Sequence, residues 1–277
     1  MPPIHGKPYS PESGDRPDLH NILFITLDTL RFDVAVAAMN EGRTPFLKQL
    51  LPDGRWEQRH SPGSFTYAAH QAFFAGFSPT PIPPGKHPRV FAAQFPGSET
   101  TNPETYVFDA PDIVTGLAQA DYHTICVGGV GFFNKRSPLG SVLPNLFHES
   151  HWDWELGVTE PESTRKQVEL AVERISLVAP SQRLFLFMNV SALHQPNCHY
   201  VAGATEDSVE TQKAALEYVS SQLSPLFESL QQRGDTFCIL CSDHGTAYGE
   251  DGYVGHRLAH SVVWTVPYAE FVVTRVN

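Results

Sequence analysis

The chain has 277 residues, 41% of them hydrophobic, and a formal net charge of −11 at pH 7. This length suits one large domain or two small ones, and the apolar fraction is sufficient for a full hydrophobic core. The acidic balance weighs against a nucleic-acid polymer as partner, since proteins that bind nucleic acids usually present a basic face.

The N-terminal stretch, residues 1–19, is rich in proline and polar side chains. It lacks the apolar core of a secretory signal, and no apolar run in the chain approaches the roughly 20 residues of a membrane span. We therefore expect a mobile N-terminal tail and a cytoplasmic protein without a membrane span. The cysteines agree, because three of the four lie in or beside apolar runs, where cysteine behaves as a small hydrophobic residue.

Apolar extended runs alternate with helical patterns along the rest of the chain. In the first half of the chain we expect a strand at 21–27, a helix that includes 44–51, a loop at 60–64, a helix at 65–77, an irregular proline-rich stretch at 79–103, a helix at 112–120 and a strand at 122–127. In the second half we expect a flexible glycine-rich loop from 128, a helix at 163–177, a strand at 184–190, a helical stretch at 206–232, and strands at 237–241 and 266–273. Ser163 should cap its helix, and Pro225 should kink or split the last helical stretch.

Strands that alternate with helices predict a mostly parallel sheet with helices on both faces. No repeat or linker divides the chain. We expect one three-layer α/β/α domain over residues 20–277.

Two of the expected strands end in residues that bind metal ions. The first strand is followed by Asp28, and the strand at 237–241 is followed by Ser242, Asp243, His244 and Gly245. Parallel α/β sheets place their chemistry at such strand ends, and a glycine allows the chain to turn there. Two strands that deliver carboxylates to the same edge predict one metal site built from both ends of the chain.

A hydroxyl group lies at the start of the helix expected at 65–77. Thr66 is near the first turn, where unpaired backbone N–H groups and the helix dipole favour negative charge. A hydroxyl bound to a metal at that position can lose its proton and attack an electrophile. The alternative is that Thr66 only caps the helix and that His70 is a satisfied surface histidine.

The segment from Thr66 to Gly76 resembles the nucleophile motif of the alkaline-phosphatase superfamily. It is similar to the Thr-x-x-x-His-x-x-x-x-x-Gly pattern of nucleotide pyrophosphatase/phosphodiesterases, with Thr66 at the nucleophile and His70 and Gly76 at the following positions. In the same resemblance Asp28, Asp243 and His244 fall on metal ligands, and His256 falls on the C-terminal metal histidine. The resemblance implies an alkaline-phosphatase-like core, and the overall likeness is to small bacterial sulfatase-like hydrolases.

The chain departs from this family pattern in its cysteines and in one ligand pair. No cysteine begins the Cys-x-Pro-x-Arg stretch that type I sulfatases need, and Asp243-His244 replaces their usual Asp-Asn. Oxygen ligands alone suit calcium, whereas imidazole suits a transition metal. We therefore expect zinc, with manganese as the second choice.

The number of metal ions stays open. Two-metal phosphodiesterases of this superfamily add an Asp-x-x-x-His pair in mid-chain, but no aspartate lies four residues before His194, and Asn189 is a poor substitute. A second site could still assemble from histidines, namely His194, His199, His256 and His260. In the one-metal alternative, which resembles phosphoglycerol and phosphoethanolamine transferases, the equivalent histidines contact the substrate phosphate.

The residues and the resemblance together predict a metal-dependent hydrolase of phosphate esters, of the phosphodiesterase or phosphomonoesterase type. Asp28, Asp243 and His244 hold the metal, with His194, His256 and His260 as further ligands. Thr66 is the metal-activated nucleophile, and His194 and His256 hold a second ion or protonate the leaving group. The expected substrate is a small-molecule, lipid-like or nucleotide-like phosphate ester. The alternatives are a phospho- or sulfo-group transferase, a sulfatase-like esterase, or a non-catalytic metal-binding partner protein. Oligomeric state is not predicted.

Overall fold

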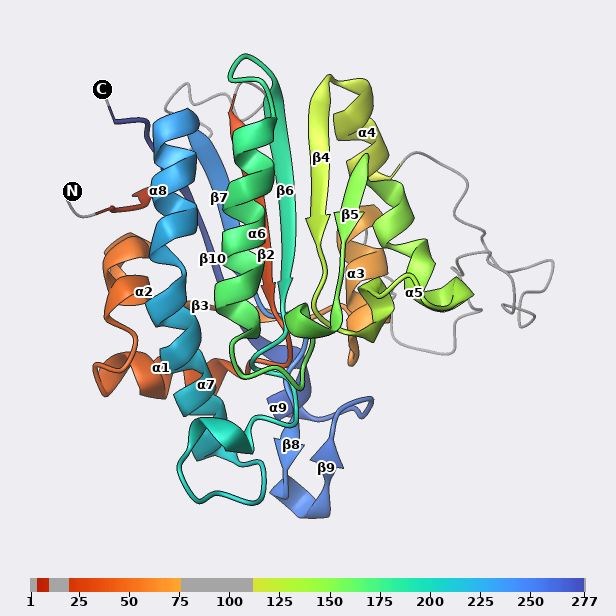
Figure 1. The fold of residues 1–277 in the computed structure, drawn as a ribbon. Coiled ribbons are helices and arrows are strands. Elements are labelled where there is room, and N and C mark those ends of the chain that lie inside the picture. Colours follow the sequence, from red (N-terminus) through yellow and green to blue (C-terminus); the bar gives the residue numbers. More distant parts are fainter. Residues whose placement is uncertain (1–3, 10–19, 76–111, 277) are drawn as a thin grey trace, which may run out of the picture.

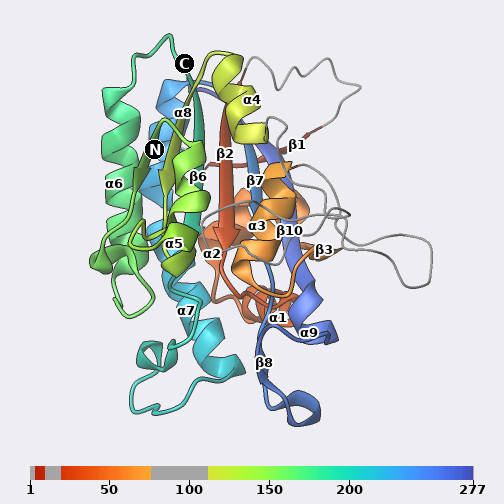
Figure 2. The same cartoon turned by 90° about the vertical axis from the view of Figure 1, so that its right-hand side faces the viewer.

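A computed structural model describes residues 4–9, 20–75 and 112–276 of the chain. Its centre is a sheet that lies between two layers of helices (Figures 1 and 2). Within the described residues the sheet has eight strands in the order β1-β10-β7-β2-β6-β4-β5, with β3 paired to β10. Strands β7, β2, β6, β4 and β5 run parallel, whereas β10 is antiparallel to its neighbours. The predicted three-layer α/β/α fold with a mostly parallel sheet is therefore confirmed.

The strands of this sheet are β1 (Lys7–Pro8), β2 (Asn21–Leu27), β3 (Glu57–His60), β4 (Tyr122–Val127), β5 (Glu149–His151), β6 (Arg183–Val190), β7 (Thr236–Cys241) and β10 (Thr265–Val273), and a separate hairpin contains β8 (Ala247–Tyr248) and β9 (Val254–Gly255). The α-helices are α1 (Phe32–Asn40), α2 (Pro45–Leu50), α3 (Thr66–Ala75), α4 (Ile113–Gln119), α5 (Pro138–Val142), α6 (Ser163–Leu177), α7 (Val209–Gln222), α8 (Ser224–Arg233) and α9 (Ser261–Trp264).

The central strand β2 shows how the layers form. Leu23, Ile25 and Leu27 point to one face and join a core with α1, α2, α6, α7 and α8. Ile22 and Phe24 point to the other face, where α3 and α4 pack. Because side chains alternate along a strand, a strand with apolar residues at nearly every position must be covered on both faces. The apolar run at 21–27 therefore fixes β2 at the centre of the sheet.

The ends of the helices agree only in part with the sequence. The helical stretch at 206–232 is split into α7 and α8, and Pro225 lies in the first turn of α8, where its missing N–H leaves no hydrogen bond unmade. We expected Ser163 to cap α6, but it does not. Glu162 occupies the cap position without a side-chain hydrogen bond, and Ser163 is already the first helical residue. Helix α1 and the edge strand β3 were not predicted.

Part of the expected N-terminal tail contacts the domain. Lys7–Pro8 forms β1 and pairs with β10, and Ile4 is buried in the larger core. Gly76 and the irregular stretch predicted at 79–103 lie outside the described residues. Within the described ranges, no helix combines the length and the apolar character that crossing a bilayer requires.

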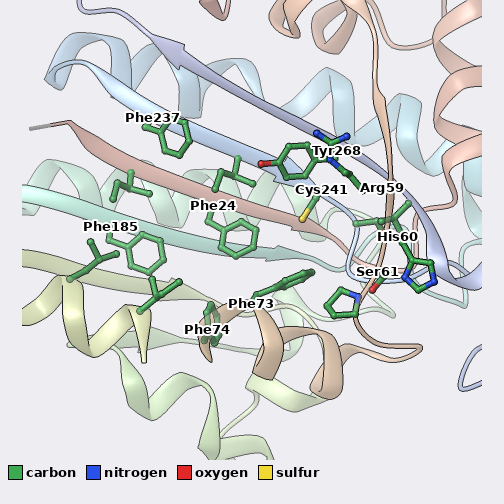
Figure 3. Close-up of a pocket in the computed structure, with 17 residues that line it drawn as sticks. Phe24, Arg59, His60, Ser61, Phe73, Phe74, Phe185, Phe237, Cys241 and Tyr268 are labelled. Atoms are coloured by element: carbon green, nitrogen blue, oxygen red, sulfur yellow. The ribbon is translucent and has the colours of Figure 1, made fainter. Parts of the chain in front are cut away.

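A cavity of about 510 Å³ lies on the face of the sheet beside α3. Figure 3 shows Phe24 and Phe185 on the strands, Phe73 and Phe74 on α3, and a more polar end at Arg59. Ile113 and Leu117 of α4 also line the cavity. The cavity reaches Cys241 and Ser242, the two residues directly before Asp243, but its lining contains none of the predicted site residues.

The loop after β4 is closely packed, in contrast to the flexible loop that we expected. A Cβ atom on Gly129 would lie 2.3 Å from the carbonyl oxygen of Asn189 and 2.8 Å from Cβ of Ser191. Gly129→Ala should therefore lower the free energy of unfolding by about 1–3 kcal/mol, as overpacking usually does. Urea denaturation measures this loss.

Gly131→Ala, two residues further on, is the matched control. Among the described residues, a Cβ atom there would have a single neighbour, at an ordinary 3.7 Å. The stability of this variant should therefore stay within about 0.5 kcal/mol of the wild type. Equal stabilities of the two variants would contradict the packing argument.

Candidate metal centre and active site

The carboxyl ends of β2 and β7 bring the predicted ligands together. The two strands are parallel neighbours with Thr26 opposite Cys241, so Asp28 and the Asp243-His244 pair leave the sheet at the same edge. One ligand atom from each of Asp28, Asp243 and His244 lies within 4.8 Å of the others, and all three residues are buried. Gly245 is required at the turn, because a Cβ atom there would lie 2.0 Å from the carbonyl oxygen of Val262.

Each of the two carboxylates is fixed by one oxygen and leaves the other without a partner. Asp243 Oδ1 accepts hydrogen bonds from the backbone N–H groups of Thr29 and His244, at 3.2 and 3.0 Å. Asp28 Oδ2 accepts one from Asn189 Nδ2 at 3.0 Å. Asp28 Oδ1 and Asp243 Oδ2 are buried and have no hydrogen-bond partner among the described residues. Buried oxygens of this kind are costly unless a cation neutralises them.

The electrostatics of the two aspartates point the same way. Burial, followed by the charge of Asp243, raises the pKa of Asp28. Burial raises the pKa of Asp243 to about 7, although the hydrogen bonds that Asp243 accepts from backbone N–H groups act to lower it. Two adjacent buried carboxylates resist ionisation, and a bound cation reverses that effect. The chain's own groups therefore fit a metal ion at this point.

His244 presents the correct nitrogen for a ligand. Its Nδ1 lies 2.9 Å from the carbonyl oxygen of Gly245 and must donate to it, so the hydrogen is on Nδ1 and Nε2 carries a lone pair. Metal-binding histidines commonly donate their second ring nitrogen to a carbonyl in this way. Burial is the main cause that lowers the pKa of His244, which keeps the ring neutral and able to bind a metal.

Thr66 lies at the start of α3 and faces this cluster. Its Oγ1 is 3.4 Å from Asp28 Oδ2 and 3.3 Å from His244 Nε2. The hydroxyl is almost fully buried, with 2% of the residue exposed. The predicted nucleophile and the three predicted ligands thus meet at one point, although they come from three separate parts of the chain.

His70 is not the surface histidine that the sequence analysis gave as an alternative. It is fully buried, and burial lowers its pKa to about 3. Its Nδ1 donates to the carbonyl oxygen of Thr66 at 2.7 Å, and its Nε2 accepts from Thr26 Oγ1 at 3.0 Å. A neutral histidine therefore ties the first turn of α3 to β2 and fixes the backbone of Thr66.

Asn189 is a residue whose importance the sequence did not reveal. It lies opposite Thr26 in the register of β2 and β6. Its Nδ2 donates to Asp28 Oδ2 at 3.0 Å and to Thr26 Oγ1 at 3.1 Å, and its Oδ1 accepts from the backbone N–H of Val130 at 3.0 Å. We had considered Asn189 only as a poor metal ligand, whereas its amide orients Asp28.

Asn189→Leu should lower zinc affinity by about 10–100-fold, since losing a hydrogen bond that orients a ligand has that effect. The substitution frees Asp28 and leaves the N–H of Val130 unpaired. Competition with a chromophoric chelator measures the affinity. Asn197→Leu controls for general destabilisation, because it replaces a buried asparagine that is bonded to Leu193 and Thr211 and not to Asp28. Equal zinc affinity in the Asn189 variant and the wild type would contradict this role.

Four other histidines were considered as further ligands, and two of them, His194 and His256, lie near the centre. His199 is exposed, and its ring packs against that of Tyr200 with 4.3 Å between the centroids. The ring of His256 is 4.7 Å from the ring of His244 and 5.6 Å from that of His194, measured between centroids. His194 Nδ1 donates to the carbonyl oxygen of Gln195, so its Nε2 carries a lone pair that can bind a metal or accept a hydrogen bond. His256 Nδ1 is buried and has no hydrogen-bond partner within the described ranges. His260 is instead bonded to Asp251 at 3.0 Å and caps α9.

The ion pairs of the buried Arg31 position the segment that carries His256. The guanidinium of Arg31, with 4% of the side chain exposed, pairs with Asp33 at 2.6 Å and with Glu250. Glu250 lies in the turn between β8 and β9, and His256 directly follows β9. The pair therefore joins the hairpin to the end of β2. No sequence pattern connects Arg31 with Glu250, because the two are brought together only by the fold.

A cavity of about 350 Å³ opens beside this cluster. Thr66, His194 and His256 contribute to its lining, and so do Arg257 and the apolar residues after β4. A substrate in this cavity would meet the hydroxyl of Thr66 with the metal cluster next to it.

The parallel sheet and the cluster at its carboxyl edge define a member of the alkaline-phosphatase superfamily, as the resemblance implied. A family model described as Sulfatase matches residues 20–268. The chain therefore belongs to the sulfatase family, which is a family of enzymes.

Solved structures with the same fold share little sequence with this chain. The C-terminal periplasmic domain of phosphoethanolamine transferase EptC from Campylobacter jejuni is 13% identical, with a TM-score of 0.57 over 91% of this chain and 79% of that chain. The C-terminal periplasmic domain of EcEptC from Escherichia coli, in complex with Zn, is 13% identical, with a TM-score of 0.61 over 99% and 77%. Lipoteichoic acid synthase LtaP from Listeria monocytogenes is 13% identical, with a TM-score of 0.59 over 91% and 65%. The comparison with curated proteins gave no match.

The cytoplasmic location that we expected is contradicted by these comparisons. Two of the similar structures are periplasmic domains. The expectation rested on the composition of residues 1–19, and a polar N-terminal stretch does not determine the compartment in which a domain works.

Proposed function

We propose that the chain is a metal-dependent enzyme of phosphate esters in which Thr66 is the nucleophile. The observation that carries this proposal is the position of Thr66 Oγ1, 3.4 Å from Asp28 and 3.3 Å from His244 on the wall of the 350 Å³ cavity. A hydroxyl placed between a carboxylate and an imidazole has two acceptors for its proton within reach. Structural neighbours that act on phosphate esters support the same chemistry.

Asp28, Asp243 and His244 would hold the metal, and the lone pairs of His194 and His256 lie next to them. The mixed carboxylate and imidazole set suits zinc, which also occurs in a similar structure. When bound, the ion would supply positive charge that lowers the pKa of the hydroxyl and polarises the phosphoryl group. Whether His194 and His256 bind a second ion or the substrate is decided by metal content, since two ions require these nitrogens as ligands.

The chain's own residues account for the bonds that form and break. Thr66 loses its proton to a neighbouring acceptor, and its oxygen forms a bond to phosphorus while the bond from phosphorus to the leaving alcohol breaks. The alcohol departs with the electron pair and takes up a proton. Water or a second alcohol then attacks the phosphothreonine and restores the hydroxyl. His256, whose pKa is lowered to about 3 by burial and then by the neighbouring positive charges, is neutral at pH 7 and serves as a ligand or as a neutral hydrogen-bonding group.

Phosphoryl transfer to an alcohol is the second candidate function. The specific observation in its favour is that phosphoethanolamine transferases and a lipoteichoic acid synthase share the fold. A sulfatase reaction of type I is not supported, because a threonine and not a cysteine occupies the nucleophile position. By analogy with the periplasmic neighbours, we also propose that the protein works outside the cytoplasm.

Turnover of matched nitrophenyl esters tests the function. Zinc-loaded and manganese-loaded protein should release nitrophenol from bis(4-nitrophenyl) phosphate or 4-nitrophenyl phosphate faster than from 4-nitrophenyl sulfate. Addition of glycerol separates the two candidates, because a transferase forms a glyceryl ester whereas a hydrolase forms the product of water attack. A faster reaction with the sulfate ester, or no turnover by folded metal-loaded protein, would refute the proposal.

A further inference from the structure

The cavity of about 350 Å³ beside the metal cluster has one polar wall and one apolar wall. Thr66, His194, His256 and Arg257 form the polar wall, and the second wall comes from the segment after β4 and from Val158. That second wall includes Val130, Phe132 and Leu139. Among the described residues that line the cavity, none is acidic. An organic group attached to the reacting phosphorus would therefore meet hydrocarbon and no carboxylate.

Arg257 is held in this cavity by an unusual backbone conformation. Its φ is +69°, which is uncommon for a residue other than glycine. Its backbone N–H donates to the carbonyl oxygen of Ser64 at 2.8 Å, two residues before Thr66. Non-glycine residues in this conformation cost free energy and concentrate at functional sites. The hydrogen bond thus fixes Arg257 relative to the start of α3.

The charge of Arg257 is not neutralised by a neighbour. Within the described part of the chain, no carboxylate lies within ion-pairing distance of its guanidinium, which stands 5.7 Å from the ring centroid of Phe65. Its charge reaches the site, where it helps to lower the pKa of both His244 and His256. By contrast, Arg31 and Arg43 are each paired with two or more acids. An arginine side chain keeps its charge at every accessible pH.

We propose that Arg257 determines substrate charge at this site, so that the organic group on phosphorus is apolar or anionic and carries no ammonium group. The inference rests on the proposed function for the identity of the reacting group. An ammonium group in the cavity would be repelled by the guanidinium and would find no acidic partner on the described walls. Phosphoethanolamine carries such an ammonium group, so this site differs in charge from a site built for that group.

Binding of two small phosphonates tests the proposal without requiring turnover. Ethylphosphonate and 2-aminoethylphosphonate differ only in the ammonium group, and their affinities for the zinc-loaded protein can be compared by calorimetry. Wild-type protein should bind ethylphosphonate more tightly by at least about tenfold, the size expected from one unscreened like-charge contact. Arg257→Glu should reduce or reverse this ratio of the affinity for ethylphosphonate to that for 2-aminoethylphosphonate. Arg257→Gln should change the ratio in the same direction by a smaller factor.

Arg55→Glu is the matched control, because it makes the same change of charge at an exposed residue outside the cavity. Its ratio should equal that of the wild type. Wild-type preference for 2-aminoethylphosphonate, an unchanged ratio in both Arg257 variants, or absence of binding by both phosphonates would overturn the proposal. Charge-selective binding without any ester turnover would instead refute the proposed function and leave the role of Arg257 intact.

Discussion

Thr66→Ala should lower kcat for phosphate esters by at least about a thousandfold, because without a nucleophile only binding and charge stabilisation remain. The cause lies in the geometry at the start of α3. Thr66 Oγ1 is the hydroxyl that meets Asp28 and His244 on the cavity wall. Alanine keeps the helix and the cavity but removes the oxygen that we propose attacks phosphorus. Initial rates with bis(4-nitrophenyl) phosphate, at saturating metal, measure the loss.

The fold of this variant should be preserved. The hydrogen bonds of the hydroxyl are long, at 3.4 and 3.3 Å, so their loss should change stability by no more than about 1 kcal/mol. Thr66→Ser retains the attacking oxygen and should keep part of the activity. Ser64→Ala removes a hydroxyl two residues earlier and should keep nearly all of it. Turnover by Thr66→Ala within a factor of ten of the wild type would rule out Thr66 as nucleophile.

Removal of the metal should destabilise the protein strongly. A ligand present at a thousand times its Kd stabilises the folded state by about 4 kcal/mol, and for a domain of this size that corresponds to about 8 °C or more in Tm. The structural reason is that Asp28 Oδ1 and Asp243 Oδ2 are buried without hydrogen-bond partners in the part of the chain that the structure describes. Thermal unfolding with and without a strong chelator, followed by restoration with zinc, measures the effect.

The destabilisation should grow with pH. Burial raises the pKa of Asp243 from 3.8 to about 7 in the folded protein, so between these values the folded state binds more protons than the unfolded state. Protonated Asp243 therefore contributes stability to the metal-free protein that is fully present below about pH 4 and is lost as pH rises toward 7. Metal binding opposes this trend, because it favours the ionised carboxylates. The difference in Tm between loaded and chelated protein should be larger at pH 8 than at pH 5.

Asp28→Asn is a control that should change the stability of the metal-free protein in the opposite direction. The amide is close in shape to the carboxylate but carries no charge, so the metal-free variant should be more stable than the metal-free wild type at pH 8. Its Tm should hardly respond to zinc. A chelated wild type that melts at the same temperature as the loaded protein, at both pH values, would show that the two carboxylates do not form a metal centre.

The sequence predicts best where the local pattern and the tertiary structure impose the same requirement. The bounds of β2 and β4 were predicted to the residue, because buried parallel strands are short apolar runs that end at polar residues. The meeting of Asp28 with Asp243 followed from the same logic, since parallel strands end at one edge. The helix split at Pro225 followed from the missing N–H of proline.

Other features depend on contacts that no local pattern encodes. The role of Asn189 is set by the register between β2 and β6, which places it opposite Thr26. The burial of His70 depends on the phenylalanines that surround it from β6 and from the segment after β4. His260 was grouped with His256 because the two are close in the sequence, but the short helix α9 turns His260 toward Asp251. Arg257 was missed because its backbone conformation arises from its bond to Ser64.

The pairing of β2 with β7 also governs when the site can form during synthesis. The hydrogen bond from the N–H of Thr29 to Asp243 spans 214 positions of the chain. A ribosome adds residues in order, at roughly 5–20 per second, so β2 waits for tens of seconds before its neighbour exists. Until then one edge of β2 is unpaired and able to pair wrongly. Chains that end before β7 should therefore bind zinc only weakly, and they should aggregate. Zinc uptake would thus be a marker for completed folding.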